Sequence, residues 1–263
     1  FREKNLGCGK AVSNAINWFF SHVEEGLILE DDCLPSEDFF PFCSELLERY
    51  RNDSRVMQIG GNNLNPPSER DEEYSYFFSN HNYIWGWATW RRAWDLFHYN
   101  MKYYDLVKEK RYHERYFKSF DEEVYFRYVF DKMYSNIEEA TTWDYQWQYS
   151  RMLQVGLSIV PARNLVINLG CGNGATHNVK YHNIIPSLTL EKIGFPLRHP
   201  EFMMADLATD EKNFCQVFTT RWSRIKSRIK KLIPDSLLKY VACFFFNVNP
   251  AMVLITEMVG AGE

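Results

Sequence analysis

Apolar residues recur along the first part of the chain at two spacings, which predict alternating helices and strands. Within residues 10–23, apolar side chains share one face at helical spacing, which indicates an amphipathic helix. A short apolar run at 27–29 has the length of a strand. A second helix is predicted over 39–51, after Pro35 and acids near its first turn, and a second strand over 56–59.

The pattern continues less regularly downstream. It predicts helices over 91–104 and 122–133, and one or two strands over 157–169 that Pro161 interrupts. No internal repeat is visible. The order of helices and strands predicts an α/β fold with a mixed, mainly parallel sheet that is flanked by helices.

The last part of the chain differs in character. Basic side chains are interleaved with apolar ones over 221–232, which is the composition of a basic amphipathic helix. Two interpretations stay open: the helix lies on an anionic membrane surface, or it is a solvated helix packed on the main domain. The apolar run at 237–246 is too short to span a bilayer. We therefore divide the chain into a main domain, residues 1–200, and a helical, basic region, residues 201–263.

Composition narrows the function classes. The 263 residues carry a formal net charge of −4, which argues against general nucleic-acid binding. The cysteines lack CxxC spacing, so we expect reduced thiols in a cytoplasmic protein and neither a zinc knuckle nor a dense disulfide scaffold. No apolar run reaches the roughly 18–20 residues of a spanning helix, so any membrane contact is expected to be peripheral, at the inner face. The cysteines are Cys8, Cys33, Cys43, Cys171, Cys215 and Cys243.

The strand at 27–29 ends in three consecutive acids, Glu30-Asp31-Asp32. Carboxylate oxygens suit Mg²⁺ or Mn²⁺, which normally keep further positions for water and substrate phosphates. The alternative is a solvated acidic turn after a buried strand. Aromatic residues, 17% of the chain, cluster at 83–90 and 143–147. Such clusters are usually core, but flat rings also pack against sugars and bases.

Five motifs occur in a fixed order along residues 1–183: Asn5-Leu6-Gly7-Cys8-Gly9-Lys10; Ile28-Leu29-Glu30-Asp31-Asp32 with Pro35 and Phe39-Phe40; Trp85-Gly86-Trp87-Ala88-Thr89-Trp90-Arg91-Arg92; Trp143-Asp144-Tyr145-Gln146-Trp147; and Ala175-Thr176-His177-Asn178. This ordered set resembles the nucleotide-sugar glycosyltransferases with the GT-A (Rossmann-like) fold. The likeness is closest to bacterial sugar transferases of polysaccharide biosynthesis that are distant relatives of the N-acetylglucosaminyltransferase I type.

The resemblance implies a metal-dependent donor site. Asp32 would bind Mn²⁺ or Mg²⁺, which would bridge the donor diphosphate and act as a Lewis acid on the departing nucleoside diphosphate. His177 would be a second ligand of the same ion, although a lone histidine is ordinarily a surface or hydrogen-bonded residue. Glu30 and Asp31 would contact the ribose or orient the site, with a purely structural role left open for Asp31.

The remaining donor-binding candidates come from two glycine-containing segments. By the resemblance, the loop with Gly86 and Trp87 would approach the donor sugar, because glycine lets the backbone come close. The alternative is a tight turn between core tryptophans. Asn5 and Lys10 flank the first glycine loop, and they are assigned to the donor-binding site together with Gly86 and Trp87.

Asp144 is the candidate general base. An inverting transferase needs a carboxylate that takes the proton of the acceptor hydroxyl as this oxygen attacks the anomeric carbon, and aromatic neighbours would partly desolvate Asp144. Glu122 and Glu123 are reserve candidates. They fall on a predicted helix, where a solvated or ion-paired acid is the simpler interpretation.

Donor and acceptor follow only from the likeness: a nucleoside diphosphate sugar, most simply UDP-linked, and a hydroxyl of a glycan or glycolipid. The part that holds the nucleotide base is expected upstream of Phe1, so the domain would lack its first βαβ portion. Two other functions stay open. The first is an S-adenosylmethionine-dependent methyltransferase, because the loop Gly170–Gly174 resembles the cofactor loop of these enzymes, in which Glu191 would bind the ribose. The second is a non-catalytic carbohydrate-binding protein, which would need no base at Asp144.

Overall fold

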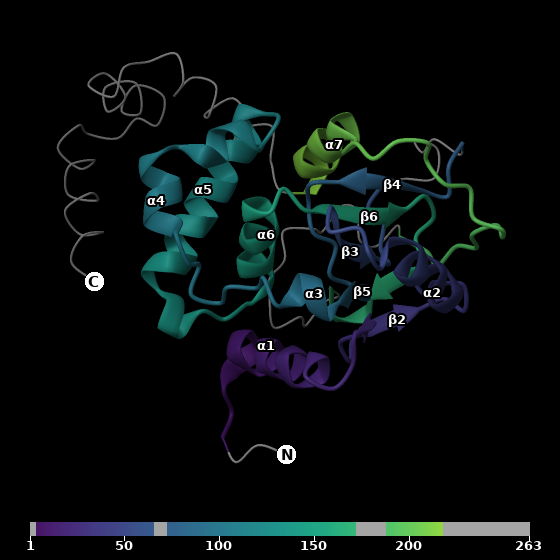
Figure 1. The fold of residues 1–263 in the computed structure, drawn as a ribbon, viewed down its shortest axis with the longest axis horizontal. Helices are drawn as coiled ribbons and strands as arrows, with labels where there is room; N and C mark the ends of the chain where they lie inside the picture. The colour runs from purple at the N-terminus through teal and green to yellow at the C-terminus, as the bar shows by residue number, and fades with distance from the viewer. Residues whose placement is uncertain (1–3, 66–72, 172–187, 218–263) are drawn as a thin grey trace. The chain divides into compact units, whose positions relative to one another are not determined.

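The computed structural model describes residues 4–65, 73–171 and 188–217 (Figure 1). The chain divides into two compact units, Phe1–Phe218 and Thr219–Glu263. The second unit, with the basic segment predicted at 221–232, lies outside the described residues. The first unit extends past residue 200 and includes one further helix.

A five-stranded sheet forms the centre of the first unit, with the strand order β1-β5-β3-β6-β4 (Figure 1). A second, two-stranded sheet pairs β2 with β7. These short strands follow β1 and β6 along the chain, so they extend from the edge at which β1 and β6 end. The strands are β1 (Glu25–Ile28), β2 (Cys33–Pro35), β3 (Val56–Gly60), β4 (Tyr76–Ser79), β5 (Trp87–Trp90), β6 (Leu157–Pro161) and β7 (Val166–Asn168).

The prediction of a mixed α/β sheet is confirmed, but the expected predominance of parallel pairs is wrong for the described strands. β3 pairs in parallel with β6, whereas β1–β5, β3–β5 and β4–β6 are antiparallel. The physical reason is an insertion: β1, β3 and β6 run in one direction, and antiparallel β5 lies between β1 and β3. Sequence patterning missed β4 and β5: β4 is only four residues long, and β5 lies in the segment that the sequence predicts to be a glycine-containing loop.

Helices pack on the sheet and also form a bundle beside it (Figure 1). α2 contacts β1, β3 and β5, whereas α5 packs on α6. In the part of the chain that the structure describes, no helix is long and apolar enough to cross a membrane. The helices are α1 (Gly7–Phe20), α2 (Phe39–Tyr50), α3 (Arg91–Trp94), α4 (Tyr104–Glu109), α5 (Phe120–Ser135), α6 (Asp144–Leu153) and α7 (Leu207–Val217), with 3₁₀ turns η2 (Tyr112–Arg115), η3 (Ile137–Glu139) and η4 (Leu169–Cys171).

The first, second and last of the predicted helices are confirmed as α1, α2 and α5. The single helix predicted over 91–104 is wrong. α3 ends at Trp94, and Met101 and Tyr103 adopt φ angles of 48° and 69°, which a right-handed helix excludes. Met101 is fully buried, so packing of its side chain holds this irregular segment in place.

Tryptophans form much of the core between α1 and the sheet. Trp87 stacks on Trp143 with ring centroids 5.5 Å apart, and Trp147 packs against both. Each of the three side chains is at most 1% exposed. A second cluster lies between α2 and the sheet, and a third joins α4, α5 and α6. The core interpretation of the aromatic segments is therefore confirmed for these residues.

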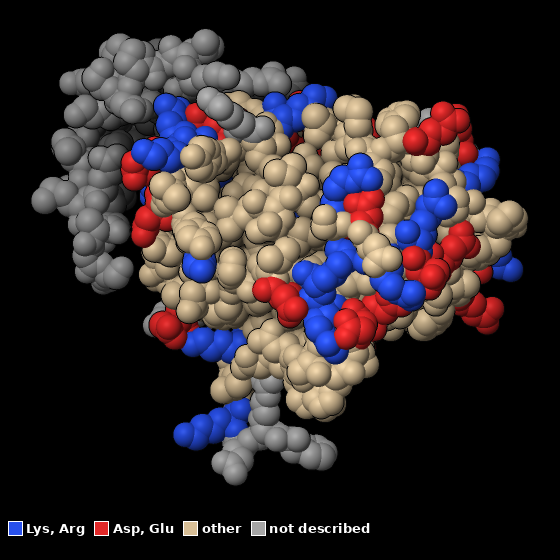
Figure 2. All heavy atoms as spheres, in the orientation of Figure 1, with Lys and Arg blue, Asp and Glu red and all other residues tan. Residues whose placement is uncertain are grey.

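Charged side chains are mixed on the face drawn in Figure 2, where Lys and Arg lie next to Asp and Glu. Arg51, for example, pairs with Glu25 at 2.7 Å and with Glu48 at 2.7 Å. Exposed pairs of this kind contribute little to stability. On this face the basic residues do not gather into one patch that would attract a polyanion.

A buried polar network joins the loop after β4 to three helices. His81 Nε2 lies 3.4 Å from Glu122 of α5. Asp210 of α7 accepts hydrogen bonds from Ser79 Oγ at 2.5 Å and from the Asn80 backbone N–H at 2.8 Å. Arg151 of α6 is fully buried beside it, and the charge of Asp210 counters the burial that lowers the pKa of Arg151 to about 10.

This network makes stability depend on pH through His81. Burial alone lowers the pKa of His81, but the charges of Asp210 and Glu122 outweigh it, so the pKa is raised above its ordinary 6.5. A raised pKa stabilises the fold fully below the unfolded-state value, and this contribution is lost as the pH rises through the folded-state value. His81→Gln should therefore lower the free energy of unfolding by about 2 kcal/mol at about pH 6 and by less at about pH 9, measured by urea denaturation.

His22→Gln, at an exposed histidine after α1, is the matched control and should leave the free energy of unfolding nearly unchanged at both pH values. An equal or larger effect of His81→Gln at the higher pH would contradict the expected charge on His81.

Candidate active site

The acidic motif forms the turn between β1 and β2. The Cys33 backbone N–H donates to the Glu30 carbonyl at 3.0 Å, which closes the turn. Asp31 is exposed, whereas Glu30 and Asp32 are half-buried. The strand that was predicted to deliver these acids exists, and the acids stand at its carboxyl end. A simple solvated turn would expose all three acids. The partial burial of Glu30 and Asp32 therefore needs a more specific explanation than a solvated turn.

Asp32 is held against the turn after β7. The Leu169 backbone N–H donates to the Asp32 carbonyl at 2.7 Å. A Cβ added at Gly170 would overlap Asp32 Oδ2, so a larger residue at this position would displace the carboxylate. Asn168 belongs to the same turn, because its side-chain oxygen accepts a hydrogen bond from the Gly170 backbone N–H at 2.7 Å. The segment that leads toward His177 therefore passes directly beside Asp32.

Asp144 lies near the same acids, although it is distant in sequence. It is the first residue of α6, and Thr142 Oγ1 donates a hydrogen bond to its carboxylate. Burial raises the pKa of Glu30, and the charges of Asp32, Asp144 and Asp31 raise it further, against a hydrogen bond from the Trp143 side chain. The fold thus brings Glu30, Asp32 and Asp144 within electrostatic range of one another.

The start of α1 reaches the same region. Burial raises the pKa of the Cys8 thiol, and the nearby charges of Glu30, Asp144 and Asp32 raise it further. Cys8 is nevertheless exposed. A thiol with a raised pKa is a poor nucleophile, so Cys8 is not a candidate catalytic nucleophile. The cysteines found free within the described ranges are Cys8, Cys33, Cys43 and Cys215.

A cavity of about 100 Å³ lies on another side of Asp144. Its lining includes Trp85, Tyr145 and Asn62, which come from three different segments. Asn62 follows β3 and Trp85 precedes β5, so the cavity lies where these two strands meet at the edge that also carries the acids. Aromatic rings next to a carboxylate are the surroundings in which a sugar ring can stack while its hydroxyl is deprotonated.

Trp87 does not line a surface. Its side chain is 1% exposed and stacks on Trp143, so the side chain has a core role, and a contact between the Trp87 backbone and a donor stays a prediction. Gly86 has φ 65°, and an added Cβ would stand 2.8 Å from Val166 and 3.0 Å from Leu29. The glycine is required there by the left-handed backbone and by close packing, which is the tight-turn alternative.

The two candidates at the N-terminal loop make local contacts. Asn5 Oδ1 accepts a hydrogen bond from the Gly7 N–H at 2.8 Å, just before α1. Lys10 Nζ pairs with Glu138 at 2.7 Å on the surface. Asn5 and Lys10 thus shape the start of α1, and their assignment to a donor stays a prediction.

The reserve acids on α5 are structural. Glu122 is 1% exposed, completes a capping box with Ser119 and faces His81. Glu123 lies near His113 and Arg127. The ion-paired interpretation is confirmed for both, and neither is among the residues that line the cavity beside Asp144.

His177 and Gly172–Gly174 lie outside the described residues, so the second metal ligand stays a prediction. Among the described residues, Glu30, Asp32 and Asp144 do not form a group whose ligand atoms all lie within 4.8 Å of one another. The roles of Asp32 as a metal ligand and of Asp144 as an acid away from the ion stay predictions. The strand before Gly170 is β7, which pairs antiparallel with β2, so the methyltransferase alternative lacks its parallel strand at this position.

No protein-family model matches the chain, and a search of curated proteins found no match. Sequence reasoning missed Cys8, Thr142 and Gly170 as members of this site. The glycines and acids in the quoted motifs signalled the region, but no local pattern indicates that the start of α1, the start of α6 and the turn after β7 converge.

Proposed function

We propose that the chain is a metal-dependent glycosyltransferase that moves a sugar from a nucleoside diphosphate sugar, most simply a UDP sugar, to a hydroxyl of a glycan or glycolipid with inversion. The observation that carries the proposal is the convergence of the half-buried acids Glu30 and Asp32 with Asp144 at one edge of the sheet. It is supported by the order of the motifs and by the aromatic cavity beside Asp144.

In the proposed reaction, Asp32 and His177 would hold Mn²⁺ or Mg²⁺. When bound, the ion would supply Lewis-acid stabilisation of the departing nucleoside diphosphate. Asp144 accepts the proton of the acceptor hydroxyl while this oxygen bonds to the anomeric carbon and the bond to the diphosphate breaks. Glu30, whose pKa is raised by burial and by its acidic neighbours, hydrogen-bonds a donor hydroxyl.

The proposal is tested by measuring Mn²⁺-dependent binding and hydrolysis of a panel of nucleotide sugars by the full-length protein. Asp32→Asn should lower the metal-dependent rate by about a hundredfold or more, because the ion supplies several kcal/mol in the transition state. Glu37→Gln, which removes an exposed acid just after β2, should keep the wild-type rate.

Absence of any nucleotide-sugar binding in the presence of Mn²⁺ would overturn the proposal. Metal-dependent binding without turnover on any acceptor would instead identify a non-catalytic carbohydrate-binding protein. Equal rates in Asp32→Asn and Glu37→Gln would contradict the role of Asp32.

A further inference from the structure

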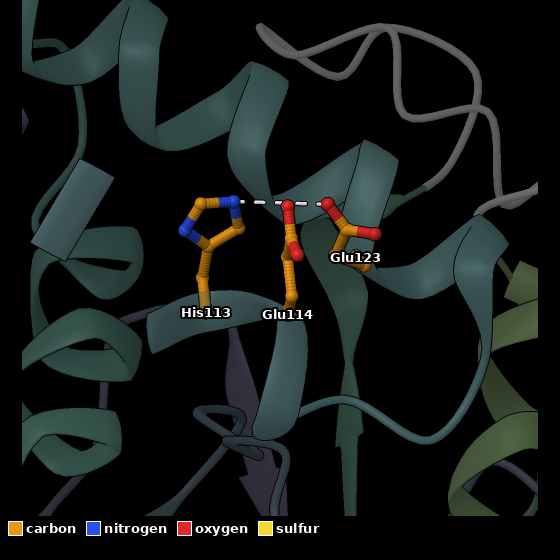
Figure 3. Close-up of side chains that lie close together, drawn as sticks. All are labelled: His113, Glu114 and Glu123. Carbon is orange, nitrogen blue, oxygen red and sulfur yellow. Dashed lines mark ion pairs between the residues drawn. The ribbon is translucent and has the colours of Figure 1, made fainter. Parts of the chain in front are cut away.

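His113, Glu114 and Glu123 form a second cluster of metal-ligand atoms. One ligand atom of each lies within 4.8 Å of the other two. His113 and Glu114 come from η2, and Glu123 comes from the first turn of α5. Figure 3 shows the imidazole and the two carboxylates directed toward one another from these elements.

The imidazole is presented in a form that suits metal binding. His113 is buried, with 5% of its side chain exposed, and Nε2 makes no hydrogen bond within the described ranges. In the tautomer with its proton on Nδ1, the lone pair of Nε2 is directed at the carboxylates.

The contact between the imidazole and Glu123 is too long for a hydrogen bond. Nε2 lies 3.7 Å from Glu123 Oε1, and Nε2 is buried without a hydrogen-bond partner within the described ranges. A cation held between these two atoms would bind both of them.

Two neighbouring arginines pair with the carboxylates but not with His113 Nε2. Arg127 Nη1 lies 3.6 Å from Glu123 Oε1, and Arg111 Nε pairs with Glu114 Oε1. Both arginines extend from exposed positions, with 40% and 72% of their side chains accessible. Each carboxylate has two oxygens, so an arginine on one of them does not occupy both.

We propose that His113, Glu114 and Glu123 bind a divalent transition-metal ion, for which Zn²⁺ is the best match. Imidazole nitrogen and carboxylate oxygen are both zinc ligands, and three protein ligands leave a fourth position for water. The site shares no residue with the proposed Asp32 site and does not depend on it.

The ion would tie η2 to α5. The Tyr125 hydroxyl of α5 bonds the Tyr145 hydroxyl of α6 at 2.9 Å, one residue from Asp144. Because an ion that binds only the folded state stabilises it, Zn²⁺ should raise the melting temperature of the whole unit.

The test is a chelator-competition titration of the metal-free, full-length protein with Zn²⁺, together with the absorption spectrum of the Co²⁺-loaded protein. We expect one tight Zn²⁺ per chain, retained in Asp32→Asn. Glu123→Gln and His113→Gln should weaken it at least about tenfold, the lower bound for disturbing a metal ligand shell. His22→Gln, at an exposed histidine, should bind as the wild type does.

Glu123→Gln keeps the size of the side chain, so its circular dichroism and thermal transition without metal report whether it has folded. Wild-type affinity in a folded Glu123→Gln and in His113→Gln would overturn the proposal. So would loss of the tight ion in Asp32→Asn, or a cobalt–thiolate charge-transfer band, which would place the ion at the Asp32 site or at cysteines.

Discussion

Replacing Asp144 by asparagine is expected to reduce the turnover of a nucleotide sugar by about 10²- to 10⁴-fold, the usual contribution of a general base. Asparagine keeps the shape of the side chain and can still accept the hydrogen bond from Thr142. It cannot take a proton from an acceptor hydroxyl. Mn²⁺-dependent donor binding should be retained, because Asp144 lies outside the proposed metal shell.

The measurement is the steady-state transfer rate together with donor affinity by calorimetry. Asp131→Asn is the control, because this acid lies on the surface of α5 and pairs with Lys108. It should keep the wild-type rate. Full activity of Asp144→Asn would show that another group is the base, and loss of donor affinity equal to the loss of rate would place Asp144 on the metal instead.

Asp210→Ala is expected to lower the free energy of unfolding by about 3–5 kcal/mol, as for other buried charges that lose a partner. Asp210 is 2% exposed and holds the end of β4 through Ser79 and the Asn80 backbone. Its charge also opposes the burial penalty of Arg151, which is fully buried. Within the described part, Nε and Nη1 of Arg151 make no hydrogen bond, so the loss of Asp210 would remove one of the interactions that oppose the burial of this cation.

Urea denaturation measures the effect, and Asp206→Ala is the matched control on the same helix. Asp206 is exposed and accepts from the Thr209 N–H at 3.0 Å, so its loss should cost about 1 kcal/mol, as for an N-cap. The double variant Asp210→Ala with Arg151→Met should recover part of the loss, because both charges are then absent. Equal effects of the two aspartate variants, or strictly additive effects in the double variant, would contradict the role of the network.

Much of the fold could be predicted from the sequence, because several of its helices and strands follow from the local spacing of apolar residues. α1, α2 and α5 each present one apolar face, and β1 and β3 are short apolar runs between turns. β5 was not predicted, because its segment directly follows Gly86 and was interpreted as part of a glycine-containing loop. Its antiparallel insertion between β1 and β3 depends on pairing partners that are distant in sequence.

By itself, the sequence determined the acidic turn at residues 30–32, the helices with one apolar face and the α/β class, because these features arise between neighbours in the chain. The tertiary structure decided which side chains share a site. It placed Asp144 and Cys8 near Glu30 and Asp32, placed Trp87 in the core, and brought His113 to Glu123. Such convergence depends on packing between distant segments, for which local spacing carries no signal.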